Sequence, residues 1–245
     1  MIPVSDTVPR RYPPVMVWLL IATNAAVFLF ELSLPDKAAE AFFYHYGLVP
    51  ARYTHPDWAM LHGLDPYNYL PFITDMFLHG GLAHIVLNMW TLWLFGAAVE
   101  DRLGSLRFLI FYFLCGLAAN VTHLLVNADS TVPVVGASGA IAGVMGAYMV
   151  MFPLARIVFF IPILFIPFFF ELPAVIFMAI WFWLQFLEGT QSLLSTDIHG
   201  GVAWWAHIGG FLTGIVLTPF FRIACRHCRP YFRDESLWGH GPRGE

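Results

Sequence analysis

The chain has 245 residues, of which 59% are hydrophobic and only 11% are charged. A typical soluble domain is about 25% charged, so most of this surface is expected to face a lipid bilayer. The formal net charge of −4 and the lack of runs of like charge argue against a nucleic-acid partner. Three cysteines do not make a disulfide framework.

Apolar runs of membrane-spanning length recur along the chain and predict an all-α membrane protein with six transmembrane helices. The expected spans are about 15–34, 78–99, 106–126, 138–152, 173–188 and 204–221, which together form one membrane domain over 15–221. Residues 1–14 carry four prolines and Arg10–Arg11, so they are expected to be a cytoplasmic tail rather than a cleaved signal. Residues 222–245 are expected to be a second cytoplasmic tail.

Three segments between the spans have their own character. Residues 35–77 are mixed and poorly periodic, and they predict a partly embedded outer loop that is anchored by Tyr44, Tyr53 and Trp58. Residues 154–172 are very apolar but contain Pro162 and Pro167, which favours an embedded connector over a helical span. Residues 189–203 are expected to be a polar loop.

The positive charges support this topology. If the N-terminus is cytoplasmic, six spans leave only two basic residues, Lys37 and Arg52, in the outer segments. The inner segments then hold ten: Arg10, Arg11, Arg102, Arg107, Arg156, Arg222, Arg226, Arg229, Arg233 and Arg243. This is the bias that the positive-inside rule predicts, so both termini are expected in the cytoplasm.

Polar residues within the apolar runs are candidates for function, because they are costly in a membrane. His84 and Asn88 lie four residues apart and therefore share one face of the second span. Ser138 opens the fourth span and His207 opens the sixth, so all four side chains are expected near the outer face. Glycines on the two spans, Gly139, Gly143 and Gly146 on one and Gly210 and Gly214 on the other, would let their backbones approach closely.

This set of residues suits acyl transfer. A serine hydroxyl needs a base such as a neutral imidazole, and the attacked carbonyl needs hydrogen-bond donors for its developing negative charge. Taken singly, a serine is usually a helix cap, a histidine an interface residue and an asparagine interhelical glue. Together they predict a Ser138–His207 dyad. The string GASGA is not the GxSxG turn of soluble hydrolases, because position 140 is alanine.

Three motifs resemble those of the rhomboid family of intramembrane proteases: HGGLAHIVLN over 79–88, GASG over 136–139 and AHIGGFLTG over 206–214. The resemblance implies a six-span bacterial inner-membrane serine protease whose active site opens to the outer side. It implies Ser138 as nucleophile and His207 as base, with His84, Asn88 and the Ser138 backbone N–H around the oxyanion. Gly136 would shape the active-site loop, while Gly139, Gly210 and Gly214 would serve packing and His79 would be structural or line a water path. Single-span membrane proteins would be the substrates, with no cofactor and no metal.

Two features depart from the family pattern. Many relatives carry an aromatic residue four positions after the serine, but here the residue is Ala142. Another group must therefore hold His207, and Tyr148, Trp204 and Trp205 are candidates. The paired Trp and Arg of the first outer loop in many relatives are separated here as Arg52 and Trp58, which leaves the anchoring of that loop open.

Other interpretations remain. The chain could bind client transmembrane helices without cutting them, or it could transport a metal or solute by way of His79, His84 and His207. Cys225 and Cys228 form a CxxC that could bind zinc, although reduced thiols on a cytoplasmic tail are the simpler interpretation. Cys115, within an apolar run, is expected to be a small core residue.

Overall fold

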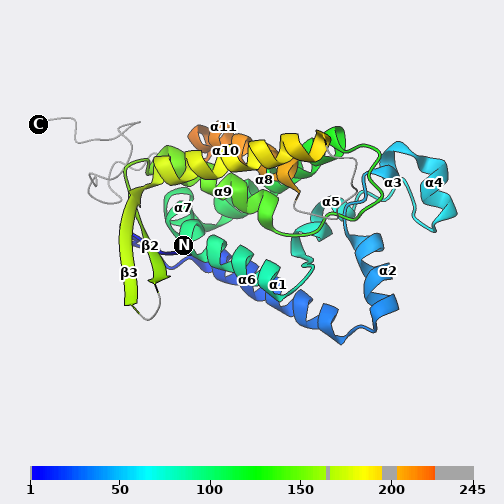
Figure 1. Ribbon diagram of the computed structural model, residues 1–245, viewed down its shortest axis with the longest axis horizontal. Helices are drawn as coiled ribbons and strands as arrows, with labels where there is room; N and C mark the ends of the chain where they lie inside the picture. Colours follow the sequence, from blue (N-terminus) through cyan, green and yellow to red (C-terminus); the bar gives the residue numbers. More distant parts are fainter. Residues whose placement is uncertain (1, 164–165, 195–202, 224–245) are drawn as a thin grey trace, which may run out of the picture.

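The computed structural model describes residues 2–163, 166–194 and 203–223, and most of them are helical (Figure 1). Among them are six long helical segments: α1 (Val15–Ser33), the run formed by α6 (Leu82–Thr91), the π-helical turn η2 (Leu92–Gly96) and α7 (Ala97–Leu103), then α8 (Ser105–Val126), α9 (Ser138–Met151), α10 (Ala174–Leu194) and α11 (Trp204–Phe221). The second segment covers 82–103 and is thus shifted by four residues from the expected span 78–99. Helix α10 continues beyond 188 into the expected loop. Residues 195–202 and the Cys225–Cys228 pair lie outside the described residues.

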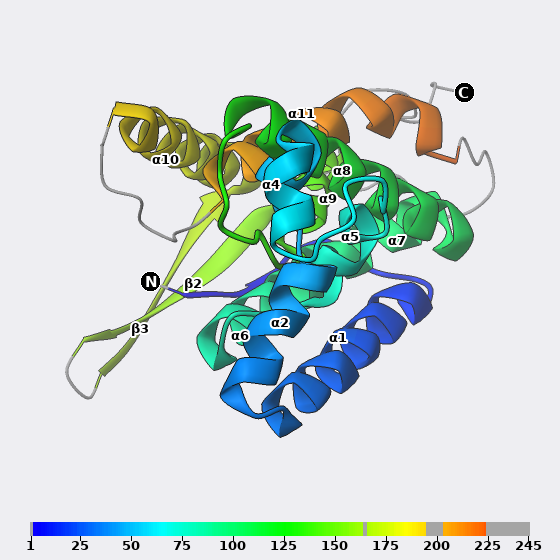
Figure 2. The same cartoon turned by 90° about the vertical axis from the view of Figure 1, so that its right-hand side faces the viewer.

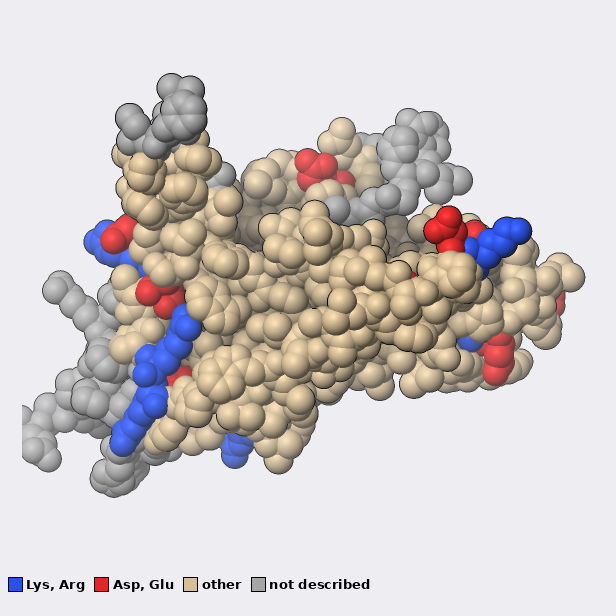
Figure 3. Space-filling view, turned by 90° about the horizontal axis from the view of Figure 1, so that it is seen from below, with Lys and Arg blue, Asp and Glu red and all other residues tan. Residues whose placement is uncertain are grey.

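Four of these segments are long and apolar enough to cross a membrane: Val15–Ser33, Leu82–Leu103, Ser105–Val126 and Trp204–Phe221. Large apolar side chains such as Leu29, Val216 and Phe220 are exposed on them. Figure 3 shows most charged side chains toward the two ends of the molecule, with a broad uncharged surface between them. These features are those of an integral membrane protein.

α9 is the central helix of the bundle. In Figure 2 it lies among α8, α10 and α11, with α1 and α6 on the opposite side. Every residue from Gly139 to Tyr148 is buried. Because protein rather than lipid surrounds this helix, its sequence can be rich in glycine and alanine, and it need not be long enough to span alone.

Glycines set the separation between α9 and α11. A methyl group on Gly210 would overlap the carbonyl oxygen of Gly139, and one on Gly214 would overlap that of Gly143. Likewise, a methyl group on Gly146 would overlap the carbonyl oxygen of Phe211. The two helices are thus in backbone contact over two turns, which is the close approach that small residues permit in membrane helices.

A three-stranded antiparallel sheet closes one end of the bundle, at the left of Figure 1. Its strands are β1 (Ile2–Asp6), β2 (Arg156–Ile163) and β3 (Ile166–Pro173), in the order β1-β2-β3. The prediction of an all-α protein missed this sheet, and the predicted connector over 154–172 forms its hairpin rather than a helical span. Pro162 and Pro167 break a helix but lie opposite one another in the hairpin, where the neighbouring aromatic and β-branched residues favour a strand. The remaining strand, β1, is formed by residues of the expected N-terminal tail.

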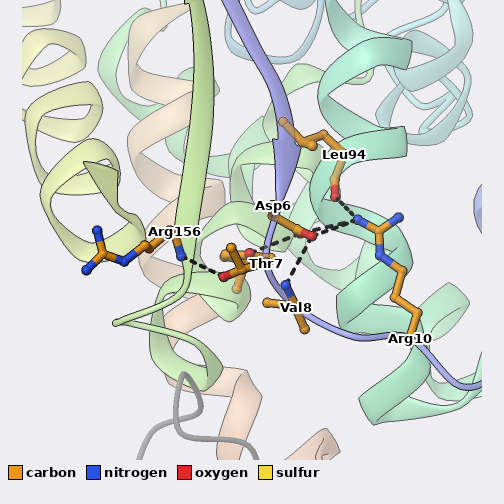
Figure 4. A network of polar contacts seen from close by, with 7 residues as sticks. Asp6, Thr7, Val8, Arg10, Leu94 and Arg156 are labelled. Carbon is orange, nitrogen blue, oxygen red and sulfur yellow. Dashed lines mark hydrogen bonds and ion pairs between the residues drawn. The ribbon is translucent and has the colours of Figure 1, made fainter. Parts of the chain in front are cut away.

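Polar contacts fasten the N-terminal strand to the helices (Figure 4). The Asp6 carboxylate accepts hydrogen bonds from Arg10 at 3.2 Å and from the hydroxyl of Tyr148, on α9, at 3.0 Å. Arg10 also donates to the carbonyl oxygen of Leu94, inside the π-helical turn, at 3.1 Å. Burial raises the pKa of Asp6, while Arg10 and these hydrogen bonds oppose that rise. Strand β1 is thereby attached to two helices of the bundle.

The segment from 35 to 77 is more regular than expected. It contains α2 (Asp36–Tyr46), α3 (Ala51–Thr54), α4 (Pro56–Leu61), α5 (Pro71–Thr74) and the 3-10 turn η1 (Asp75–Phe77). Arg52 is 2% exposed and anchors the segment by donating to the carbonyl oxygens of Asp65 at 2.8 Å and His45 at 3.1 Å. Among the expected anchors, Tyr53 donates to the carbonyl oxygen of Asn68 at 3.0 Å and Trp58 stacks on His62.

The glycine contact generates a prediction about stability. We expect Gly214→Val to destabilise the protein by about 3 kcal/mol or more, because the new side chain would overlap the backbone of α9. Thermal unfolding in detergent measures the change. Leu212→Val, at an exposed position of the same helix, is the matched control, and equal melting of the two variants would contradict backbone contact at this position.

Candidate functional site

Ser138 and His207 lie within hydrogen-bond distance of one another. Ser138 is the first residue of α9, is half-buried, and places its Oγ 2.8 Å from Nε2 of His207. His207 lies in the first turn of α11 and is 8% exposed. The pair follows from the glycine contact, since Ser138 directly precedes Gly139 and His207 lies three residues before Gly210. A hydroxyl in contact with an imidazole nitrogen can lose its proton to that nitrogen.

The other nitrogen of the His207 ring is also engaged. Nδ1 lies 2.6 Å from Oε1 of Gln185, a residue of α10 that is 7% exposed. Gln185 is not among the site residues predicted from the sequence. The signal was present, because a glutamine in an apolar span is as unusual as the polar residues that were chosen.

Two tryptophans pack near the His207 ring. Trp181 of α10 lies 5.9 Å away between ring centroids, and Trp204 lies 6.3 Å away with its ring perpendicular. Of the three proposed supports, only Trp204 is in this position. Tyr148 donates instead to Asp6, and the ring of Trp205 packs near Phe186. Ala142, which stands where many relatives have an aromatic residue, is buried on α9. Of the two tryptophans, Trp181 of α10 is the nearer to the His207 ring.

The loop before Ser138 passes against His84 and Asn88. Gly136 has a φ of 125°, and a Cβ at this residue would lie 2.7 Å from Nε2 of His84 and 3.5 Å from Nδ2 of Asn88. Only glycine suits both this backbone conformation and this space. The Gly136 N–H donates to the carbonyl oxygen of Asp75 at 2.8 Å, which fixes the loop against the 3-10 turn η1.

Asn88 holds an unused donor. Its side chain is 7% exposed, and Nδ2 has no hydrogen-bond partner among the described residues. A buried amide without a partner is costly, so this one is available to a group that enters the site. The ring nitrogens of His79, which is 1% exposed, likewise have no hydrogen-bond partner among the described residues; its ring lies edge-on to His84 and its backbone N–H donates to Glu31.

A cavity of about 400 Å³ opens beside this loop. It lies between α2 and the segments around Gly80 and Val135, and its polar lining includes Asp36, Glu40 and Tyr44. Ser138 does not line it.

The helix that begins at Ser138 is short. α9 has 14 residues and is therefore about 21 Å long, whereas the hydrocarbon core of a bilayer is about 30 Å thick.

The sequence of this chain is similar to known proteins over most of its helices. A family model described as a rhomboid domain matches residues 66–223, which include Ser138, His207, His84 and Asn88. The chain is 32% identical over 146 residues to YdcA, a rhomboid protein of Bacillus subtilis, covering 60% of this chain and 66% of that protein. It is 30% identical over 173 residues to the mitochondrial RHOMBOID-like protein 6 of Arabidopsis thaliana, covering 71% of this chain and 50% of that protein.

A shorter match is 40% identical over 77 residues to the rhomboid protease GluP of Bacillus subtilis, covering 31% of this chain and 15% of that protein. The chain thus spans no more than about two thirds of the length of these relatives. The family model, however, covers more than half of the chain, and its range contains all three sequence motifs. The chain belongs to the rhomboid family.

Proposed function

We propose that this protein is an intramembrane serine endopeptidase that uses Ser138 as nucleophile and His207 as general base. The observation that carries the proposal is the 2.8 Å contact between Ser138 Oγ and His207 Nε2. Membership of a family whose named members include the rhomboid protease GluP supports the same reaction. The substrates are single-span membrane proteins, cleaved in or near their spans.

The reaction begins when His207 Nε2 accepts the proton of Ser138 Oγ as this oxygen attacks the carbonyl carbon of the scissile bond. The carbonyl oxygen becomes negatively charged and is stabilised by the Asn88 amide, His84 and the backbone N–H of Ser138. His207 then gives its proton to the leaving amine, which departs from the acyl-enzyme, and a water activated by His207 releases the second product. None of these steps needs a metal or a cofactor.

In the proposed topology the chain crosses a bacterial membrane six times, and α9 and α10 are the fourth and fifth spans. Both termini lie in the cytoplasm. The sheet then lies at the cytoplasmic end of the bundle, and the segment 35–77 lies at the outer end with Ser138. Because α9 is short, its first residue lies below the membrane surface, where water can enter from the outer side. The membrane domain comprises residues 15–221, flanked by residues 1–14, which include strand β1, and by a tail over 222–245.

A cleavage assay tests the dyad. Purified wild type, Ser138→Ala and His207→Ala are reconstituted in liposomes with a fluorogenic substrate that carries one transmembrane segment rich in small residues. We expect wild type to cleave it with or without chelator, and each variant to lose about 10⁴-fold or more in kcat, because neither half of the pair acts alone.

Ser33→Ala, an exposed serine on α1, is the matched control and should cleave at the wild-type rate. Cleavage that persists in both dyad variants would refute the proposal. A wild type that binds the substrate without cutting it would favour a non-catalytic binder, and activity lost on chelation would favour a metal-dependent protein.

The unused amide of Asn88 gives a second prediction. We expect Asn88→Leu to lower kcat by roughly 10²- to 10³-fold with little change in KM, because an oxyanion donor acts mainly in the transition state. Steady-state kinetics on the same substrate separate the two constants. Leu87→Ala, at an exposed position of the same helix, should leave both unchanged, and an Asn88→Leu enzyme at the wild-type rate would remove this residue from the oxyanion site.

A further inference from the structure

The proposed mechanism places a requirement on His207. To accept a proton from Ser138, Nε2 must carry a lone pair, so the proton of the neutral ring must be on Nδ1. A buried Nδ1–H needs an acceptor, because an unpaired polar group in this position is costly. Without such an acceptor, the ring is free to adopt the other tautomer, in which Nε2 is a donor and cannot act as base.

The acceptor present in the structure is an amide rather than a carboxylate. Oxygen Oε1 of Gln185 lies 2.6 Å from Nδ1 on the side of the ring opposite Ser138. We propose that Gln185 is a positioning residue of this site, which holds His207 in the tautomer and orientation that activate Ser138. The inference rests on the proposed function and extends the dyad to a Ser138–His207–Gln185 chain of contacts.

The way that α10 meets α11 supports this role. Trp181, Gln185 and Gly189 are spaced four residues apart, so they share one face of α10. Trp181 packs near His207 and Phe211, while a Cβ on Gly189 would lie 3.3 Å from the Cβ of Trp204. Small Gly189 thus allows the start of α11 to approach α10, and Gln185, between these two contacts, meets the ring of His207.

The choice of an amide has a physical reason. A carboxylate in this buried position would carry a charge in a low-dielectric region, at a large desolvation cost. The titratable groups that act on His207 from the helices around it are His84 on α6 and His123 on α8, and neither would compensate a negative charge while neutral. A neutral amide can accept the Nδ1–H and avoid that cost, although it stabilises the imidazolium less than a carboxylate would.

Two substitutions at this position separate positioning from packing. Gln185→Leu keeps the approximate shape but removes the acceptor, whereas Gln185→Glu retains one. We expect Gln185→Leu to lower kcat roughly 10- to 100-fold with KM nearly unchanged, which is the range for a hydrogen bond to a group that becomes charged. Gln185→Glu should recover much of kcat and move the acidic limb of the pH–kcat profile to higher pH, because a carboxylate stabilises the imidazolium.

The matched control is Gln191→Leu, at an exposed position of the same helix, which should leave kcat and the pH profile at wild-type values. If active wild type and Gln185→Leu differ by less than about twofold in kcat, Gln185 has no positioning role, while the proposed protease function stands. Equal loss in Gln185→Leu and Gln185→Glu, with no shift of the acidic limb, would also overturn the role. A wild type without any activity would overturn the proposed function, and this inference with it.

Discussion

The arrangement of the site depends on backbone contact between α9 and α11. Gly210 and Gly214 pack directly on the carbonyl groups of Gly139 and Gly143, so the start of each helix has one position relative to the other. A lipid bilayer offers little hydrophobic drive for two helices to associate, and close packing must supply much of it. The same contact that holds the helices together brings the hydroxyl of Ser138 to the ring of His207.

The far end of α9 is held by a different kind of interaction. Tyr148 donates to Asp6, which belongs to the strand that pairs with the Phe-rich hairpin. Arg10 connects the same carboxylate to the π-helical turn that follows α6, and α6 carries His84 and Asn88. The N-terminal strand therefore joins α9, which begins at Ser138, to the helix of His84 and Asn88, at the end of the bundle opposite the site.

Much of this architecture follows from local sequence signals. The apolar runs predict helices at α1, α8, α9 and α11 within a few residues of where they occur, because uninterrupted apolar runs of this length can form little else in a membrane. The pairing of Ser138 with His207 could be predicted from the sequence, because each lies beside the glycines of its apolar run and few polar residues do so. The hairpin over 156–173 could not be predicted, since a proline-containing apolar run is compatible with several structures until its partner strand is known. Gln185 was missed although a glutamine in an apolar span is itself a signal, because only the contact between α10 and α11 shows that it meets His207.

The central claim is that His207 activates Ser138, and covalent labelling tests it most directly. The reconstituted protein is treated with a fluorophosphonate, which reacts with activated serine hydroxyls, and the modified peptide is located by mass spectrometry. The account predicts modification at Ser138 in wild type and its near-complete loss in His207→Ala. Modification of Ser138 at an equal rate in His207→Ala, or modification of a different serine in wild type, would contradict it.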